Sequence, residues 1–263
     1  ERGIATMEEG IKLRRKIVAE HPERVDLAYP LAIDLNGLAT AYQASGKPEL
    51  AIEPARQSID LFTRLDREFP ATLPYQTGFY LAHDLMARLR NQRGESKEAL
   101  RSANSTREAL DRLLVNHPKN PIFLADLSRC HGFIARLHQS DGKFHDALRS
   151  YQQAVDLLES MPKIDPANSY QLAVNLAQCI PLVGATADEP APYDDEKLSP
   201  TDLRRRALYG TRAVEALRKA REGGVNDLQT YEDDHGLDPI RDREDFQALL
   251  KSLAEDRQEP PKP

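Results

Sequence analysis

Three histidines, a cysteine and an aspartate lie close together around the stretch HGFIARLHQSDGKFH and could in principle form a metal site. The histidines, His131, His138 and His145, are spaced seven residues apart, with Cys130 and Asp141 beside them. Two ligands on one helix need a spacing of about three or four residues, whereas seven residues separate two side chains by about 10 Å along the axis. The spacing argues against a shared metal ion, and we expect ordinary packed or solvated histidines.

The other reactive side chains do not assemble into a catalytic set. Cys130 has no fixed cationic neighbour in the sequence that would activate its thiol. The acidic run EPAPYDDEKL lacks the ligand spacing of a calcium loop, and the basic run LRRRALYG belongs to a chain of net charge -6. We therefore expect no catalytic residue, metal or cofactor, and no nucleic-acid partner.

The composition favours amphipathic helices. Of the 263 residues, 30% are charged and 6% are aromatic, and there is no Trp. Each helix of a repeat protein needs only one apolar stripe, which suits such a hydrophilic chain. Two cysteines make no disulfide framework, and no apolar run is long enough to span a membrane. We expect an all-α cytoplasmic protein with no membrane insertion.

A repeat of 48 residues runs through the chain. It is marked by glycines at Gly46, Gly94 and Gly142, and by prolines at Pro22, Pro70, Pro118 and Pro166. Small residues follow each glycine at the same distances: Ala51, Ala99 and Ala147, then Ala55, Ala103 and Tyr151, then Ser58, Thr106 and Ala154. Glycine allows the positive φ of a helix end, and small residues allow two helices to approach closely.

Each repeat is therefore predicted to be a pair of antiparallel helices of roughly 20 residues joined at the glycine. The prolines at 70, 118 and 166 are expected to close the second helix of each pair. Pro54 falls inside a predicted helix, where it removes a hydrogen bond, and we expect a kink in that repeat alone.

The repeat resembles the tetratricopeptide repeat (TPR). The residues that carry this resemblance are Leu35, Leu38, Ala39, Tyr42, Gly46, Ala51, Ala55 and Ser58, with their equivalents in the next two repeats. The family's usual period is about 34 residues, and the 14 extra residues here add about two turns to each helix. The resemblance implies an α-α superhelix, or solenoid, of elongated TPR-like helical hairpins, with HEAT-like pairs as the alternative.

The repeat divides the chain into segments. Residues 1–22 are expected to be the second helix of a truncated preceding repeat, and 23–166 to form three repeats over about 23–70, 71–118 and 119–166. A divergent helical pair is expected over 167–222, with an acidic, proline-rich loop at 185–198. The helix after this loop should begin at Ser199 and Pro200. A capping turn and helix over 223–253 and a disordered tail over 254–263 complete the prediction.

A second resemblance concerns the whole chain. The motifs AEHPER and VNHPKN, followed by RAVEALRKAREGGVNDLQ and LDPIRDREDFQALL, look like the C-terminal portion of large bacterial serine/threonine protein kinases, especially those of planctomycetes. No glycine-rich phosphate loop, His-Arg-Asp or Asp-Phe-Gly motif occurs in the sequence. The resemblance therefore implies a non-catalytic, regulatory part of such a kinase.

The TPR resemblance also implies a binding surface on the first helices. The positions it assigns to that concave face are Asn36, Thr40 and Gln43, then Asp84, Arg88 and Asn91, then Arg129, Arg136 and Gln139. Arginine can hold a carboxylate through two hydrogen bonds, so we predict a protein or peptide partner, with an acidic segment as one candidate. The competing interpretation is a solvated helix face on which Arg88 pairs with Asp84. The chaperone-binding type of TPR is disfavoured, because Asp84 stands where a second Asn would be.

We therefore predict a non-catalytic scaffold for protein interactions. Two alternatives stay open. One is self-association through apolar surface on residues 1–20, and the other is a metal-dependent helical enzyme that uses Cys130, His131 and His138.

Overall fold

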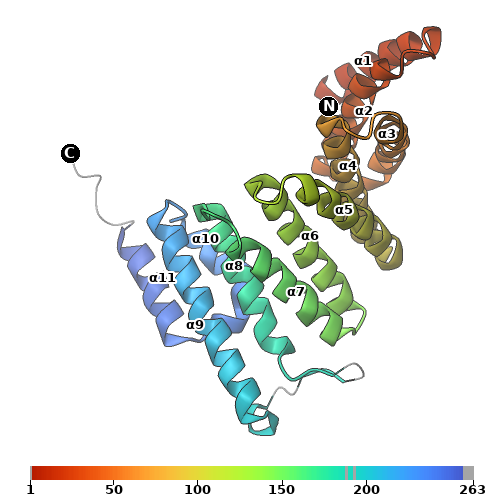
Figure 1. Cartoon of the computed structure of the whole chain (residues 1–263). Helices are drawn as coiled ribbons and strands as arrows, with labels where there is room; N and C mark the ends of the chain where they lie inside the picture. The colour runs from red at the N-terminus through yellow and green to blue at the C-terminus, as the bar shows by residue number, and fades with distance from the viewer. Residues whose placement is uncertain (1, 187–188, 192–193, 257–263) are drawn as a thin grey trace. The chain divides into compact units, whose positions relative to one another are not determined.

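The computed structural model describes residues 2–186, 189–191 and 194–256, and within them the chain is built of helices joined by short connections (Figure 1). It divides into two compact units, Glu1–Pro118 and Lys119–Pro263. The helices of the first unit are α1 (Arg2–Glu20), η1 (Val25–Leu27), α2 (Ala28–Ala44), α3 (Pro48–Glu68), α4 (Leu73–Gln92) and α5 (Ser96–Asn116). Those of the second unit are α6 (Pro121–Ser140), α7 (Phe144–Glu159), α8 (Pro166–Cys179), η2 (Ile180–Leu182), η3 (Asp195–Lys197), α9 (Pro200–Glu222), α10 (Leu228–Asp233), η4 (His235–Ile240) and α11 (Glu244–Asp256). The prediction of an all-α fold is confirmed.

The helices pack as consecutive hairpins. Helix α2 packs on α3 and α4 on α5 in the first unit, and α6 packs on α7 and α8 on α9 in the second. The three predicted turn glycines, Gly46, Gly94 and Gly142, have φ values of 71°, 74° and 74°. At each turn the residue after the glycine donates its N–H to a carbonyl five residues earlier, as Lys47 does to Tyr42 at 3.0 Å. This is the Schellman motif, which satisfies carbonyls that the helix end leaves free.

Small residues hold the two helices of a hairpin together. Ala51 and Ala55 in α3, and Ala99 and Ala103 in α5, are at most 1% exposed. In α7 the equivalent of Ala55 is Tyr151, which is also 1% exposed. The close contact predicted from the spacing is therefore present, with a larger side chain in the third hairpin.

A hydroxyl group links the paired helices at one repeated position. Ser58 Oγ in α3 donates to the backbone oxygen of Ala32 in α2 at 2.8 Å. In α7 the equivalent of Ser58 is Ala154, and there Ser128 in α6 donates to the Ala154 oxygen at 2.9 Å. Thr106 Oγ1 makes the same bond to Tyr80 at 3.4 Å between α5 and α4. The interhelical bond recurs although its donor has moved from one helix to the other.

The prolines at 54 and 166 occupy different places in their helices. Pro54 lies inside α3, which runs as one helix from Pro48 to Glu68, and the kink expected there stays a prediction. Pro166 does not close a helix; it is the first residue of α8, with the Asp165 carboxylate accepting the Asn168 N–H at 2.8 Å as the N-cap. Helix α7 has already ended at Glu159, because Pro162 follows and restricts the residue before it to extended backbone.

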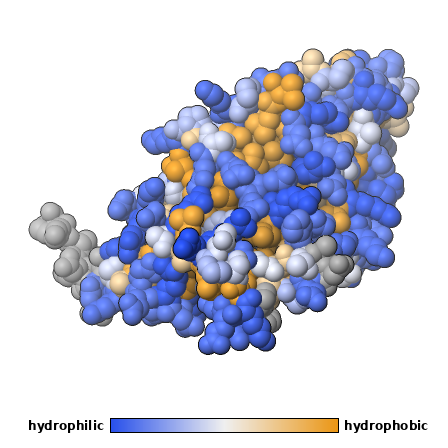
Figure 2. Space-filling model, turned by 60° about the horizontal axis from the view of Figure 1, so that its bottom comes forward, coloured by the Kyte–Doolittle hydropathy of each residue, from blue (hydrophilic) through white to orange (hydrophobic). Residues whose placement is uncertain are grey.

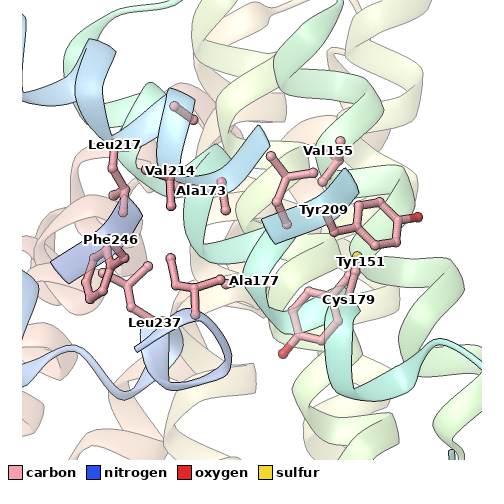
Figure 3. Packing of buried hydrophobic residues seen from close by; sticks show 14 of the residues in the cluster. Tyr151, Val155, Ala173, Ala177, Cys179, Tyr209, Val214, Leu217, Leu237 and Phe246 are labelled. Atoms are coloured by element: carbon pink, nitrogen blue, oxygen red, sulfur yellow. The ribbon is translucent and has the colours of Figure 1, made fainter. Parts of the chain in front are cut away.

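The second unit has a large apolar core built from repeat helices and the C-terminal segment (Figure 3). Phe246 from α11 and Leu237 from η4 are fully buried, together with Ala173 and Ala177 from α8 and Leu217 from α9. As predicted, the helix after the loop has Ser199 as its N-cap and Pro200 as its first residue. The segment after Gly224 therefore covers the last hairpin with apolar side chains.

The end of the chain differs slightly from the predicted boundary. Residues 254–256 complete α11 instead of starting a tail, and 257–263 lie outside the described residues. Within the predicted loop 185–198, residues 187–188 and 192–193 also lie outside them, while Asp195–Lys197 form the short helix η3. None of the helices within the described ranges is both long enough and apolar enough to cross a membrane.

Candidate functional site

The nine residues assigned to the binding face lie on three first helices. Asn36, Thr40 and Gln43 are on α2, Asp84, Arg88 and Asn91 are on α4, and Arg129, Arg136 and Gln139 are on α6. The first six belong to the first unit and the last three to the second.

Several of these polar groups bond within the protein. Thr40 Oγ1 donates to the backbone oxygen of Asn36 at 2.9 Å, one turn earlier on the same helix. Gln43 Nε2 donates to Gln92 Oε1 at 3.3 Å. Asn91 has an exposed side chain, while its backbone oxygen accepts the Gly94 N–H at 2.9 Å in the turn.

The three predicted arginines have different surroundings. Arg88 pairs with Asp84 at 3.1 Å on its own helix, and Arg129 pairs with Asp126 on its own helix. The Arg88–Asp84 pair is largely exposed and contributes roughly 0.5 kcal/mol or less to stability, but it partly neutralises both charges. Arg136 lies over the Phe133 ring, with its guanidinium carbon 5.7 Å from the ring centre.

An apolar groove opens on the first unit between α2 and α4. We define this apolar groove by Tyr29, Ile33 and Asn36 of α2, Phe62 of α3, and Leu73 and Leu81 of α4. Its volume is 440 Å³. Three of its large aliphatic side chains remain exposed to solvent, Ile33 at 46%, Leu73 at 38% and Leu81 at 42%.

The floor of the apolar groove is a rigid aromatic cluster. Phe62 is 2% exposed, and its ring meets that of Tyr29 edge to face at a centroid distance of 6.2 Å. Gly78 of α4 lies directly on Phe62, because a Cβ atom built at this glycine would be 2.0 Å from the ring. The absence of a side chain at Gly78 therefore lets the backbone of α4 approach the ring.

One polar atom of the apolar groove has no partner. Asn36 Oδ1 is buried and accepts no hydrogen bond from the described residues. A buried carbonyl oxygen without a donor costs about 1 to 3 kcal/mol. This oxygen is therefore an acceptor to which a bound segment could donate an N–H.

A more polar pocket of 610 Å³ lies within the second unit. We define this polar pocket by Arg136 and Gln139 of α6, Tyr151 of α7, Gln178 of α8, and His235 and Gly236 of η4. The Tyr151 hydroxyl has no hydrogen-bond partner at normal distance among the described residues. Burial raises the pKa of Tyr151 to about 12, while the nearby Arg136 guanidinium acts in the opposite direction. The hydroxyl is therefore a neutral donor at physiological pH.

The histidines and cysteines form no metal-binding group of three among the described residues. Cys130 and His131 are buried within α6, and the described residues contain no group of three or more His, Cys, Asp or Glu side chains able to hold a metal. Burial lowers the pKa of His138 and raises that of Cys179 to about 12, which keeps the Cys179 thiol protonated and unreactive.

The sequence prediction included one residue of the apolar groove, Asn36, but missed its apolar lining. It selected polar first-helix residues, whereas the groove is lined by Ile33 and Leu81, which occupy equivalent positions 48 residues apart. The third residue at that position is Arg129. A comparison of repeats at each position would have shown two large apolar residues on a face expected to be polar. The contribution of His235 and Gly236 to the polar pocket could not be found in this way, since that segment has no equivalent in the repeats.

Comparison with known proteins identifies the fold. No protein-family model matches the chain, and no curated protein sequence matches it. Among solved structures, the chain is similar to BtubC (BKLC) from P. vanneervenii, with a TM-score of 0.60 and 18% identity over 100% of this chain and 94% of that chain. It also matches a Podosopora anserina putative kinesin light chain with nearly identical TPR-like repeats, with a TM-score of 0.44 and 15% identity over 89% of this chain and 99% of that chain. Together with the helical hairpins described above, the likeness to BtubC shows that the chain has an all-α fold of TPR-like helical repeats.

Proposed function

We propose that the chain is a non-catalytic scaffold that binds a segment of a partner protein in the apolar groove. The observation that carries this proposal is the gathering of exposed Ile33, Leu73 and Leu81 around the unpaired Asn36 oxygen. Polar residues cover most of the surface seen in Figure 2, and apolar side chains reach it only in patches between them. Exposed apolar patches of this kind typically mark interaction sites.

The groove favours a peptide with one bulky apolar side chain. Such a side chain would cover the Phe62 and Tyr29 rings and displace water from Ile33 and Leu81. A backbone N–H of the peptide would then donate to Asn36 Oδ1, which removes the cost of its unpaired state. Because the aromatic floor is already packed, little ordering of the protein would oppose binding.

Of the nine polar positions, Asn36 lines the apolar groove, and the other five of the first unit take a secondary part in this proposal. Thr40, Gln43, Asp84, Arg88 and Asn91 continue the first-helix face beyond the apolar groove, where they could hold the polar part of a bound segment. We further propose, from the sequence motifs alone, that the chain is the partner-binding region of a serine/threonine protein kinase.

Selection from a random peptide library displayed on phage tests the proposal. The chain should select peptides that share a bulky apolar residue, and Leu81→Lys should weaken their binding by about 10-fold or more, because burial of a Leu side chain contributes about 1.5 to 3 kcal/mol. Val115→Lys is the matched control, since Val115 is 80% exposed on α5. The proposal fails if selected peptides lack apolar residues or bind the Leu81→Lys variant as tightly as the original chain.

A second candidate function is self-association through α1. Leu13 and Ile17 are 63% and 46% exposed, although their equivalents one repeat later are Leu61 and the fully buried Leu65. In the hairpins, this face of a second helix is covered by a first helix. Analytical ultracentrifugation of the original chain and of the double variant Leu13→Lys, Ile17→Lys tests this. If α1 mediates self-association, the original chain should form an oligomer and the double variant should be monomeric.

A further inference from the structure

We propose that the polar pocket of the second unit binds a carboxylate group of a peptide through Arg136 and the Tyr151 hydroxyl. This inference names a ligand chemistry for the proposed scaffold and rests on that function. It concerns a different site from the apolar groove, and its first evidence is the contrast between two equivalent arginines.

Arg88 and Arg136 occupy the same position in consecutive repeats, but only Arg88 has an acidic neighbour one turn earlier. That neighbour is Asp84, and its equivalent in the next repeat is Gly132. Gly132 therefore leaves Arg136 without the intrahelical partner that neutralises Arg88. Arg136 makes no ion pair with a carboxylate among the described residues; it lies over the Phe133 ring and lines the polar pocket. A guanidinium in this state can still form a bidentate pair with a carboxylate.

Tyr151 supplies the second, independent observation. The equivalent positions in the first two hairpins are Ala55 and Ala103, which only pack the helices together. In the third hairpin a tyrosine that is 1% exposed extends from this position to the pocket. Its hydroxyl lies beside the Arg136 guanidinium, which can only donate, so the O–H has no acceptor within the described part of the chain. A buried O–H without an acceptor costs free energy, which a bound acceptor would recover. A carboxylate oxygen beside Arg136 is such an acceptor.

The opposite wall of the polar pocket is fixed by structural hydrogen bonds. Gln178 Nε2 donates to the Gly236 oxygen at 2.9 Å, which ties η4 to α8. Asp234 also lines the pocket, but its two carboxylate oxygens accept the Gly236 N–H at 2.7 Å and the Tyr170 hydroxyl at 3.0 Å. A Cβ atom at Gly236 would lie 2.7 Å from Val174 Cγ1, so this segment fits closely against α8. The pocket is therefore preformed for a small polar group.

Small carboxylates test the site without requiring a protein partner. The probes are N-acetylglycine, which has a free C-terminal carboxylate, N-acetylglutamate amide, which has only a side-chain carboxylate, and N-acetylglutamine amide, which has neither. Each is titrated into the full chain while the Arg136 Nε–Hε and Gly236 backbone N–H resonances are followed by NMR. We expect both carboxylates to shift these resonances and to bind about 10-fold more tightly than the glutamine probe. The tighter of the two identifies a terminal or a side-chain carboxylate as the natural group.

Three variants decide whether the named residues are responsible. Arg136→Gln should weaken carboxylate binding about 10-fold, and Tyr151→Phe, which keeps the ring and removes only the hydroxyl, should weaken it roughly 3- to 10-fold. Arg149→Gln is the matched control and should leave the affinity unchanged, because Arg149 lies outside the polar pocket and pairs with Asp146 on its own helix. Equal responses to all three probes, or undiminished binding by Arg136→Gln, would overturn the inference. The probes carry no bulky apolar group and therefore do not report on the apolar groove. Failure of carboxylate binding would not contradict peptide binding in the apolar groove, and failure of groove binding would not contradict carboxylate binding in the polar pocket.

Discussion

The contact between Gly78 and Phe62 allows a quantitative test of how the apolar groove is built. A Cβ atom at Gly78 would be 2.0, 2.2 and 2.6 Å from three atoms of the Phe62 ring, whereas carbon atoms pack at about 3.5 to 4.0 Å. The ring is fully buried and cannot rotate away freely. Gly78→Ala should therefore cost about 1 to 3 kcal/mol through overpacking, against a gain of about 1 kcal/mol in helix propensity. The net change in the free energy of unfolding should be a loss of up to about 2 kcal/mol.

Gly37 provides the matched control. It lies within α2, and a Cβ atom built there meets no atom within 4 Å. Gly37→Ala should therefore stabilise the first unit by up to about 1 kcal/mol, since only helix propensity changes. The comparison is made by urea unfolding followed by circular dichroism, with each variant measured against the original chain.

Replacement of the ring should reverse the effect of Gly78→Ala. The equivalents of Phe62 in the next two repeats are Leu110 and Leu158, so Phe62→Leu introduces a side chain that the repeat already uses. Gly78→Ala combined with Phe62→Leu should be more stable than the sum of the single changes predicts, with a coupling energy of about 1 to 2 kcal/mol. If Gly78→Ala stabilises the chain as much as Gly37→Ala does, the close approach of α4 to Phe62 is refuted.

Three further predictions concern stability. Burial lowers the pKa of His83 from 6.5 to about 4, so the folded state favours the neutral ring. The chain should therefore be up to ~3 kcal/mol more stable to unfolding above pH 6.5, and this stability should be lost as the pH falls towards 4. His83→Gln should weaken this pH dependence in urea unfolding. Ala99→Leu should destabilise the chain by about 1 to 3 kcal/mol, because Ala99 is fully buried between helices; an unchanged melting temperature would contradict that assignment. Ser58→Ala should cost about 1 kcal/mol by removing the bond to the Ala32 oxygen, and Ala32→Ser, which copies the third hairpin, should restore part of it in thermal unfolding.

The repeat in the sequence was sufficient to predict the hairpins. Glycines every 48 residues predicted the turns because positive φ is accessible to glycine at little cost, and Gly46, Gly94 and Gly142 adopt it. Small residues at fixed distances predicted the faces on which paired helices meet. The prediction that Pro166 closes a helix was wrong. Pro166 fits the 48-residue spacing, but α7 already ends at Glu159, before Pro162, and Pro166 begins α8.

The candidate sites were less accessible to sequence reasoning. The repeat register assigns residues to a first-helix face. Whether a polar residue on that face is free to bind a ligand depends on its neighbours in three dimensions. Arg88 and Arg136 look alike in the sequence, yet one pairs with Asp84 and the other lines a pocket with Tyr151 and η4.

By itself, the sequence determined the helical hairpins, their turns and their buried faces, because these depend on local backbone preferences and on periodic contacts between neighbouring segments. The tertiary structure alone decided where the surface is hollow and which polar atoms remain unpaired. The apolar groove lies between α2 and α4, and the polar pocket is lined by Tyr151 together with a segment more than 80 residues later in the chain. The polar pocket in particular depends on a segment that lies outside the repeats, so no repeat pattern encodes it.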